Sequence, residues 1–412
     1  MDPYLIRPVA EDEFAAFYSV GEQAFNSSWP AEAAEHERMT FEFDRSLAAF
    51  DGTRPVGTAC CYSFQMTVPG AMAPVAGVSA VSVLPTYRRQ GILSSLMRRQ
   101  LADIAAGREA IAALFASEPG IYGRYGYGVA SMHARFTIRR GEGRITSPAP
   151  SGQGAVRLRT ADPQAARAEL AKVHEQAVPG RPGMLVRDDR WWYAALLDPA
   201  YWREGSTPLR CVIAEDDAGS RGYALFSVSP AWGDDAVPAG TLHLRELIAL
   251  DPASTGALWG DLLNRDLVGE VRARMRPADD PLLYLLPDIR RARVQLVDGL
   301  WIRLIDVPAA LAQRRYARAV DVVIEVADEL VRNNAGRWRL QADAGGAASC
   351  ERTAAAADVA MPVPALGAAY LGGTRLGALA GAGLVTEIRP GALAELSAAM
   401  SWDPAPWSPM IF

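Results

Sequence analysis

Residues 81–101 read Val81-Ser-Val83-Leu-Pro85-Thr-Tyr-Arg88-Arg89-Gln-Gly91-Ile-Leu93-Ser-Ser-Leu-Met-Arg-Arg-Gln-Leu101, a pattern typical of a strand, a basic glycine turn and a helix. Val81 and Val83 alternate with small residues, as in a strand, and Pro85 cannot continue a central strand. Apolar residues then recur at helical spacing from Leu93 to Leu101. A helix N-terminus presents unpaired backbone N–H groups and a partial positive charge, and glycine lets an anion approach them. With two arginines beside it, this turn is predicted to bind a pyrophosphate.

The order of these residues resembles the acetyl-CoA site of the GNAT superfamily of N-acetyltransferases. The pattern of that site is usually written (Arg/Gln)-x-x-Gly-x-(Gly/Ala). Arg88 and Gly91 fit the pattern, whereas Leu93 stands where the pattern has glycine or alanine. The resemblance implies an acyltransferase with acetyl-CoA as co-substrate. The alternative is an ordinary strand, turn and helix whose basic turn is only solvated.

A second segment joins an apolar run to a turn rich in glycine and tyrosine. It reads Ala110-Ile-Ala-Ala-Leu-Phe-Ala-Ser-Glu-Pro-Gly-Ile-Tyr-Gly-Arg-Tyr-Gly-Tyr-Gly128. The run up to Ala116 predicts a buried strand, because serine, proline and glycine bound it. We expect the rings of Tyr122 and Tyr125 to pack in the core. We expect Tyr127 to carry its hydroxyl into a cleft as a general acid, with a purely structural ring as the alternative.

Two further runs, Asp298-Gly-Leu-Trp-Ile-Arg-Leu304 and Val307-Pro-Ala-Ala-Leu311, complete a resemblance to a known family. Together with the motifs above and the closing Phe412, they resemble the enhanced-intracellular-survival (Eis) proteins, GNAT enzymes of actinobacteria and some other bacteria. The match runs nearly end to end, and this family tolerates leucine at the position of Leu93. In the family, the tyrosine of the Gly-Tyr-Gly step acts as general acid, and the carboxylate of the last residue acts as base. The resemblance therefore implies Tyr127 and the terminal carboxylate of Phe412 as catalytic groups.

The same resemblance implies two sets of binding residues. For acetyl-CoA they are Val81, Val83, Arg88, Arg89, Gly91, Ile92, Leu93 and Ser117. For the acceptor amine they are Phe25, Ser27, Ser79, Ala80 and Ile411. Ser27, Ala80 and Ile411 replace acidic or larger residues of relatives that acetylate aminoglycosides. We therefore expect a less acidic and less crowded pocket, in which aminoglycosides are weak acceptors and another amine or a lysine side chain is the alternative.

The composition suits a soluble enzyme. The chain has 412 residues, 50% of them hydrophobic, which predicts two or three domains with large cores. No apolar run could span a bilayer and no basic-then-apolar signal begins the chain, so we expect a cytoplasmic protein without a membrane partner. The four cysteines and four histidines have no metal-ligand spacing, so we expect no metal. The net charge of −5 argues against a nucleic-acid partner.

Acidic residues gather near the N-terminus. The first 50 residues hold ten acidic side chains and only three arginines. In GNAT enzymes this region helps to wall the acceptor pocket, and an acidic wall would attract a cationic amine. For most of these residues, however, a solvated helical face is the reading that we favour.

The pattern of elements divides the chain into three segments, 1–150, 151–300 and 301–412. The first holds the motifs, with expected helices near 11–25 and 30–40, strands near 46–50, 56–66 and 76–84, and a linker at 147–152. The second repeats this plan weakly. The residues that directly follow Asp251-Pro252, up to Leu258, contain no arginine, so we expect a degenerate GNAT-like domain without a CoA site.

The third segment changes pattern. Apolar residues alternate in three runs, at 322–326, 338–340 and 359–363, which predict strands. Two short helical stretches follow, at 364–371 and 390–400. These predict an α+β layer, which resembles the sterol-carrier-like domain that ends Eis proteins. The expected fold class is thus mixed α/β, with a catalytic and a degenerate GNAT fold in tandem before a sterol-carrier-protein-like domain.

The last residues, Trp402-Asp-Pro-Ala-Pro-Trp-Ser-Pro-Met-Ile-Phe412, are broken by proline yet apolar. A disordered tail would be polar, so we expect this one to bury itself and deliver its carboxylate to the active site. The mechanism would be direct acetyl transfer to an amine, without an acyl-enzyme. The resemblance also implies a closed homo-oligomer, often a hexamer arranged as a trimer of dimers or a dimer of trimers. Two alternatives stay open: a non-catalytic sensor of CoA or lipid, and an acyltransferase with another acyl donor or acceptor.

Overall fold

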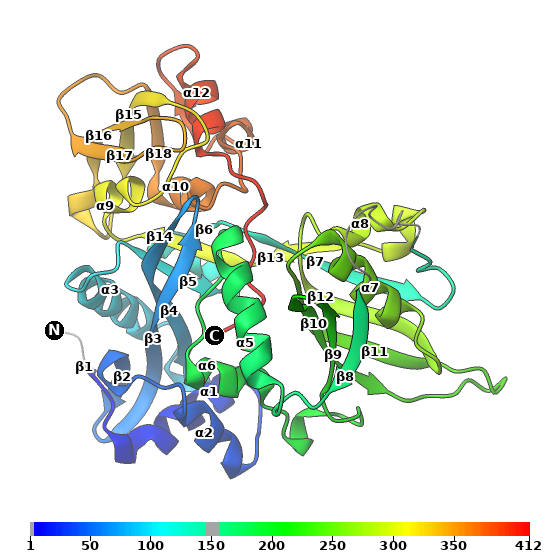
Figure 1. Cartoon of the computed structure of the whole chain (residues 1–412). Helices are drawn as coiled ribbons and strands as arrows, with labels where there is room; N and C mark the ends of the chain where they lie inside the picture. Colours follow the sequence, from blue (N-terminus) through cyan, green and yellow to red (C-terminus); the bar gives the residue numbers. More distant parts are fainter. Residues whose placement is uncertain (1–3, 146–155) are drawn as a thin grey trace. The chain divides into compact units, whose positions relative to one another are not determined.

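The structure is a computed structural model that describes residues 4–145 and 156–412. The chain forms two compact units (Figure 1). One comprises residues up to Ser131 together with Gly299–Pro406 and Ile411–Phe412, and we call it the catalytic unit because the residues predicted for catalysis fall in it. The other, the central unit, comprises Met132–Asp298 and Trp407–Met410. The linker expected at 147–152 lies outside the described residues. Among the helices of the described part, none is both long and apolar enough to cross a bilayer.

The catalytic unit is built on a seven-stranded sheet with the order β1-β2-β3-β4-β5-β14-β6. Its strands are β1 (Leu5–Arg7), β2 (Ser46–Asp51), β3 (Arg54–Val68), β4 (Ala71–Val83), β5 (Ile111–Phe115), β6 (Gly128–Val129) and β14 (Leu300–Leu304). β4 and β5 run parallel and pair only where Val75–Gly77 faces Ile111–Ala113. Both strands continue beyond this pairing, and the candidate site lies around those continuations.

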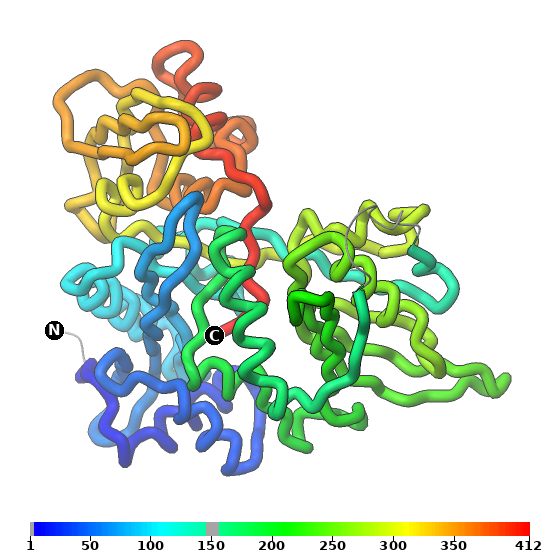
Figure 2. The backbone as a smooth tube through the Cα atoms, in the orientation of Figure 1, coloured from blue at the N-terminus to red at the C-terminus, as the bar shows by residue number. Residues whose placement is uncertain are grey.

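Strands β3 and β4 form a long hairpin (Figure 2), which Pro69 and Gly70 close. Gly70 has a φ of +65°, which glycine adopts without a steric penalty. Near the other end the register shifts, so that Ala80 and Val81 together face the single residue Ala59. This is a β-bulge, a device that re-aims neighbouring groups, and Ala80 has a left-handed φ of +49°. The bulge lies beside the candidate site.

Residues 4–131 also form four α-helices, and the sequence predicts the first three of them. They are α1 (Phe14–Phe25), α2 (Ala31–Arg38), α3 (Ile92–Ala105) and the single turn α4 (Pro119–Tyr122). The helix α1 packs on β3 and β4, and α3 packs on β2, β3 and β4. The buried face of α3 includes Ile92, Leu96 and Leu101, which confirms the helical spacing of its apolar residues.

Two strands pair across the segment limits expected from the sequence. β14 lies antiparallel between β5 and β6, and all five of its residues are buried. Conversely, β7 (Met132–Arg139) falls in the first expected segment but belongs to the sheet of the central unit, where it pairs with β12 and β13. Each partner is far away in the sequence, so hydrophobic periodicity finds the strand and not the sheet that it joins.

A second sheet of the catalytic unit has the order β17-β16-β15-β18-β19. Its elements are β15 (Val320–Ala327), β16 (Gly336–Ala342), β17 (Ala348–Arg352), β18 (Val359–Pro362), β19 (Thr386–Glu387), α9 (Val307–Ala312), α10 (Val363–Tyr370), α11 (Leu376–Gly381) and α12 (Ala392–Met400). The three predicted strands and two predicted helices are confirmed. β17 and β19 were not predicted, because neither has a clear alternation of apolar residues. The result is the expected α+β layer.

Glycines allow this layer to pack closely on the first sheet. A Cβ atom on Gly128 would lie 1.9 Å from the carbonyl oxygen of Pro364, and one on Gly367 would lie 2.3 Å from that of Ile302. Beside them the fully buried Arg303 pairs with Asp328 at 2.7 Å. A side chain at either glycine would therefore separate α10 from β6 and β14.

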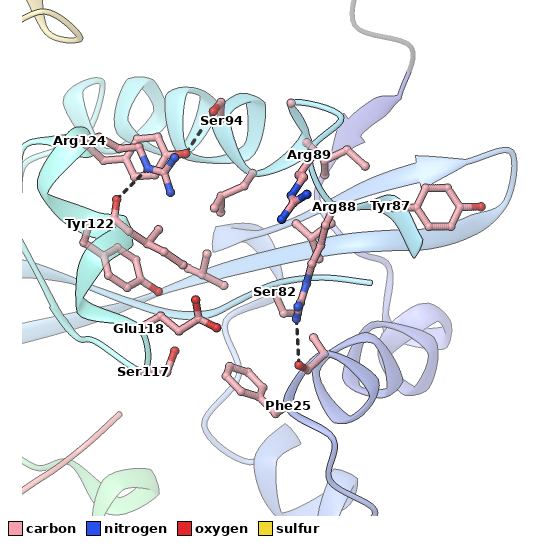
Figure 3. Close-up of a pocket in the computed structure, with 18 residues that line it drawn as sticks. Phe25, Ser82, Tyr87, Arg88, Arg89, Ser94, Ser117, Glu118, Tyr122 and Arg124 are labelled. Atoms are coloured by element: carbon pink, nitrogen blue, oxygen red, sulfur yellow. Dashed lines mark hydrogen bonds between the residues drawn. The ribbon is translucent and has the colours of Figure 1, made fainter. Parts of the chain in front are cut away.

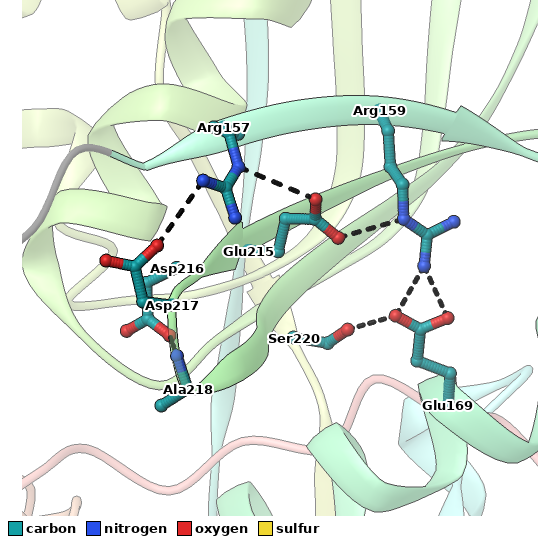
Figure 4. A network of polar contacts seen from close by, with 8 residues as sticks. All are labelled: Arg157, Arg159, Glu169, Glu215, Asp216, Asp217, Ala218 and Ser220. Carbon is teal, nitrogen blue, oxygen red and sulfur yellow. Dashed lines mark hydrogen bonds and ion pairs between the residues drawn. The ribbon is translucent and has the colours of Figure 1, made fainter.

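The central unit is a seven-stranded sheet with the order β13-β7-β12-β11-β10-β9-β8. Besides β7, its elements are β8 (Arg157–Ala161), β9 (Arg210–Asp216), β10 (Gly219–Ser229), β11 (Gly240–Ala249), β12 (Val268–Pro277), β13 (Gln295–Asp298), α5 (Arg167–Ala177), α6 (Asp189–Leu196), α7 (Pro252–Leu263) and α8 (Leu282–Leu285). Ion pairs tie the edge strand β8 to its neighbours (Figure 4). Arg159 pairs there with Glu215 at 3.0 Å and also with Glu169.

The start of α7 corresponds to the glycine turn before α3. Asp251 caps α7, and its carboxylate accepts a hydrogen bond from the backbone N–H of Ser254 at 2.8 Å. The same carboxylate pairs with Arg221 at 3.2 Å. The N-terminus of α7 is thus capped by a carboxylate of the protein itself, unlike that of α3.

Candidate active site

A cavity of about 310 Å³ opens at the start of α3 (Figure 3), and we call it the arginine cavity. Its walls come from the end of β4, the turn before α3, the first turn of α3 and the segment 117–125. The structure brings together here all the residues predicted for acetyl-CoA, which are Val81, Val83, Arg88, Arg89, Gly91, Ile92, Leu93 and Ser117. In Figure 3, Arg88 and Arg89 lie on one side of the cavity and Tyr122 on the other.

The turn that carries the two arginines has a distinctive backbone. β4 ends at Val83, the short 3-10 helix η3 (Pro85–Tyr87) follows, and α3 begins at Ile92. Both Arg89, at φ +63°, and Gly91, at φ +86°, are left-handed. No side chain caps α3, and among the described residues a Cβ on Gly91 would meet nothing within 4 Å. The N-terminus of α3 is therefore open to an anion, as the sequence predicts.

A second cavity, of about 320 Å³, shares part of its wall with the first. It is lined by Phe14, Phe17, Tyr18, Gly21, Glu22, Phe25, Ser27, Trp29, Glu37, Phe41, Thr58, Tyr62, Val78, Ser79, Ala80, Val81, Phe115, Ser117 and Tyr122. Nine of these nineteen side chains are aromatic, so we call it the aromatic cavity. Four of the predicted acceptor residues, Phe25, Ser27, Ser79 and Ala80, line it. Ile411 does not, and that residue is 59% exposed.

The two cavities meet at four residues. Phe25, Val81, Ser117 and Tyr122 line both of them. Val81 and Ser117 lie beyond the point where the pairing of β4 with β5 ends, so the separation of these strands creates the junction. A thioester held in the arginine cavity and an amine held in the aromatic cavity would meet beside Tyr122.

Tyr127, the predicted general acid, lies elsewhere. It lines neither cavity, and its buried hydroxyl has no hydrogen-bond partner among the described residues. Gly126, which directly precedes Tyr127, has a left-handed φ of +89° and lies against the side chain of Arg303. Tyr127 therefore belongs to the core under β14, and burial raises the pKa of its phenol far above the ordinary value. This corrects the expectation that its hydroxyl reaches a cleft.

Tyr122 takes the place expected of Tyr127. It ends the single turn α4, which Pro119 begins, and its ring lies between the two cavities. Burial raises the pKa of the Tyr122 phenol, while a hydrogen bond with the side chain of Ser117 acts in the opposite direction. The phenol is therefore protonated at neutral pH and can donate a proton. The sequence signal for it was present, because Tyr122 lies in the same glycine-rich turn, but the expectation was that its ring only packs.

The end of the chain packs on the catalytic sheet. The ring of Phe412 lies 4.9 Å from that of Phe64 on β3 and 5.4 Å from that of Phe115 on β5, measured between centroids. A Cβ on Gly77 would come within 3.0 Å of the same ring. Since Phe115 lines the aromatic cavity, the last residue packs against a residue of that cavity's wall.

Two carboxyl groups face the aromatic cavity. They belong to Glu22 on α1 and Glu37 on α2, and the other acidic residues of the N-terminal region do not line it. Glu37 is exposed as a residue, yet the protein around its carboxyl group raises the pKa of that group by desolvation. Among the described residues that line the aromatic cavity, none is an arginine or a lysine. Of the ten acidic residues of the N-terminal region, these two line the cavity.

The two adjacent cysteines of β3 are poorly placed to act as nucleophiles. Cys60 and Cys61 are buried in β3, and burial raises the pKa of the Cys61 thiol to about 12. A thiol so far from ionisation is a poor nucleophile. In residues 4–145 and 156–412 no group of three or more histidine, cysteine, aspartate or glutamate side chains could hold a metal ion.

Comparison with known proteins agrees with this geometry. A family model described as an acetyltransferase (GNAT) domain matches residues 5–130, and a second model with that description matches residues 183–304. A sterol carrier protein domain matches residues 307–409. These matches cover every strand of the catalytic unit, whereas β7 and β8 of the central unit lie between the first two matched ranges.

Relatives match along the whole chain. An uncharacterized N-acetyltransferase of Streptomyces coelicolor is 46% identical over 415 residues, which cover 99% of each chain. The N-acetyltransferase Eis of Mycobacterium tuberculosis is 33% identical over 403 residues, covering 95% of this chain and 96% of its own. A crystal structure of an Eis protein from Mycobacterium abscessus has a TM-score of 0.82 at 34% identity and covers 99% of this chain and 100% of that one. The chain therefore belongs to the Eis family of GNAT N-acetyltransferases.

Proposed function

We propose that this N-acetyltransferase moves an acetyl group from acetyl-CoA directly to a primary amine bound in the aromatic cavity. The observation that carries this proposal is the junction of the two cavities at Val81, Ser117 and Tyr122. Direct transfer needs a thioester and an amine within reach of each other in one site, with no protein nucleophile between them. The two cavities meet that need because they share Tyr122, a residue that can donate a proton.

The arginine cavity is the proposed site of acetyl-CoA. Its pyrophosphate would lie at the N-terminus of α3, close to Gly91 and the guanidinium groups of Arg88 and Arg89, where backbone N–H groups and charge act together. The pantetheine arm would follow β4 past Val83 and Val81. The bulge at Ala80 and Val81 re-aims the backbone at the point where the thioester would lie. A backbone N–H of this region is the candidate donor to the carbonyl oxygen as negative charge develops on it.

Two protons must move during the reaction. A primary amine is mostly protonated at neutral pH, so a base must first remove a proton from it. The carboxylate of Phe412 is the proposed base, supported by the packing of that residue against Phe115. The neutral amine nitrogen then bonds to the carbonyl carbon, the carbon–sulfur bond breaks, and the thiolate of CoA leaves. The nitrogen gives up its second proton to the phenolate that remains once Tyr122 has protonated this thiolate, so that a neutral amide and a protonated tyrosine result. Tyr122 is the proposed donor that protonates this thiolate, in place of Tyr127.

A direct assay tests the proposal. Purified full-length protein is incubated with acetyl-CoA and one of a panel of amines comprising alkylamines, polyamines, aminoglycosides and lysine peptides. We expect release of free CoA thiol that depends on both protein and amine, and mass spectrometry should find the amine acetylated. If thiol release occurs with none of the amines although acetyl-CoA binds by calorimetry, the proposed function is wrong.

A further inference from the structure

Two parallel strands of the central unit separate as β4 and β5 do in the catalytic unit. The pairing of β11 with β12 ends at Leu244 and Ala273. Both strands continue beyond it, β11 to Ala249 and β12 to Pro277. In the catalytic unit the equivalent separation creates the junction of the two cavities. The strands of the central unit therefore part at the place that corresponds to the proposed thioester site.

The chain's own tail is bound at this place. The segment Trp407–Met410, which we call the clamped segment, belongs to the central unit. Trp407 is 4% exposed, and its indole N–H donates to the carbonyl oxygen of Met275 at 3.1 Å. Met275 lies on the continuation of β12, and the apolar cluster that contains Trp407 includes Ile248 on the continuation of β11. The indole therefore binds one separated strand and shares a core with the other.

Arg276 on β12 joins the same arrangement. Its guanidinium group lies over the ring of Trp407, 5.1 Å from the centroid, and donates to the carbonyl oxygen of Leu247 on β11 at 2.9 Å. It also pairs with the fully buried Asp280 at 2.7 Å. A cation is attracted to an indole face, and a buried carbonyl group needs a hydrogen-bond donor. Trp407 and Arg276 therefore connect the two strands where their direct hydrogen bonds end.

The backbone of the clamped segment is held as well. The N–H of Trp407 donates to the carbonyl oxygen of Pro182 at 2.8 Å, and His133 on β7 forms a hydrogen bond with the backbone of Ser408. Ser408 is fully buried, and its hydroxyl donates to the carbonyl oxygen of Met410 at 3.0 Å. Buried backbone groups with such partners open rarely. The clamped segment is therefore fixed by its backbone as well as by its indole.

We infer that the central unit uses this place to hold the tail, and that Trp407 is a positioning residue for the terminal carboxylate. This rests on the proposed function, in which the carboxylate of Phe412 is the base. Phe412 follows Met410 by two residues, so their Cα atoms lie no more than about 7 Å apart. Holding Met410 removes conformational freedom that a loose tail would keep, and so confines the carboxylate. In this account the central GNAT fold serves the reaction by holding a segment of protein.

The test measures kcat by thiol release at saturating acetyl-CoA, with the panel amine that the wild-type chain acetylates fastest. Trp407→Leu should lower kcat by about tenfold or more, because small displacements of a reacting group are costly. Trp407→Phe keeps a ring and loses the indole hydrogen bond, so kcat should fall by about threefold at most. Both variants should keep the wild-type affinity for acetyl-CoA in calorimetry, because the arginine cavity belongs to the catalytic unit.

The matched control is Trp192→Leu. Trp192 lies on α6, is as deeply buried as Trp407 and belongs to the same apolar cluster, but it is not part of the tail. This variant should lose a comparable amount of thermal stability and keep kcat within about twofold of wild type. A lower kcat in Trp407→Leu then reports the tail and not the core. Equal kcat in the two leucine variants would overturn the inference.

A combined variant shows whether Trp407 acts through the terminal carboxylate. One glycine added after Phe412 displaces that carboxylate by itself. If Trp407 only positions the carboxylate, Trp407→Leu in the extended chain should lower kcat by less than about twofold more, although it costs about tenfold in the normal chain. The same factor in both chains would mean that Trp407 acts in another way, and the inference would be wrong.

Hydrogen–deuterium exchange of the wild-type chain tests the clamp without any variant. The backbone N–H of Trp407 should exchange as slowly as those of β11, because its partner Pro182 is buried. Exchange at the rate of an exposed loop would reject the clamp even if Trp407→Leu does not fold. Absence of thiol release with every amine would instead reject the proposed function and with it the role of Trp407, whereas the slow exchange would remain.

Discussion

The rings of Tyr122 and Tyr127 meet edge to face, with centroids 6.2 Å apart and 77° between their planes. Only Tyr122 lines the two cavities, and Tyr127 is the ring behind it in the core. Tyr127 therefore supports the ring of Tyr122, and four residues separate the candidate proton donor from the packing residue in the sequence. The predictions below follow from this placement and from the two cavities.

The arginine turn should control affinity for acetyl-CoA. Arg88→Ala combined with Arg89→Ala should weaken acetyl-CoA binding by about 2 kcal/mol or more, the scale of charge-assisted hydrogen bonds. Isothermal titration calorimetry measures this. The control is Arg98→Ala with Arg99→Ala on the exposed side of α3, which removes the same charge outside both cavities and should leave the affinity nearly unchanged. An equal loss in both double variants would mean that only net charge matters.

The end of the chain should be sensitive to length. One glycine added after Phe412 keeps a carboxylate but moves it by about 3.5 Å, more than a proton transfer tolerates. We expect kcat to fall by about 10²-fold or more, whereas the melting temperature should change little because the ring of Phe412 can stay between Phe64 and Phe115. The same glycine added through an N-terminal tag is the control. Wild-type turnover in the extended enzyme would reject the terminal carboxylate and leave Glu37 as the next candidate base.

Acid should destabilise the central unit through a buried histidine. His174 packs against Trp192, and burial lowers the pKa of its imidazole to about 3. An unfolded chain takes up this proton near pH 6.5 and the native chain does not, so stability is present above that pH and is lost as the pH falls. At about pH 5.5 the loss should be about 1.4 kcal/mol.

The measurement compares melting temperatures of wild type and His174→Leu at about pH 7.5 and about pH 5.5. His133, whose pKa burial lowers to about 4, adds a loss of the same sign in both proteins. The variant should therefore lose less stability on acidification than the wild type does. Equal losses in the two proteins would show that His174 does not remain neutral in the native state.

Local sequence patterns predicted those parts of the candidate site that are formed by one continuous segment of the chain. The strand, the arginine turn and the first turn of α3 are contiguous, so alternation, Pro85 and Gly91 predict them together, and the residues proposed for acetyl-CoA all line one cavity. The helix α1 and the hairpin of β3 and β4 were predictable for the same reason. Their periodicity and turn residues agree with the fold.

Distant contacts account for what the sequence did not reveal. Whether Tyr122 or Tyr127 reaches the cavities depends on the left-handed Gly126 and on Arg303, which arrives from β14 about 180 residues later. The insertion of β14 between β5 and β6 has no local signal either. Ile411 was expected at the acceptor site from its place beside Phe412, yet only the ring of the last residue turns into the sheet.

The central claim is that the active site lies where the two cavities meet at Tyr122. The most direct test compares kcat of Tyr122→Phe with kcat of Tyr127→Phe, measured by thiol release at saturating acetyl-CoA and amine. Both variants lose one buried hydroxyl and keep the ring, so their packing changes are matched. We predict that Tyr122→Phe lowers kcat by about 10²-fold or more, the scale of a lost general acid, and that Tyr127→Phe stays within about twofold of wild type. A large loss in Tyr127→Phe with wild-type turnover in Tyr122→Phe would contradict the account.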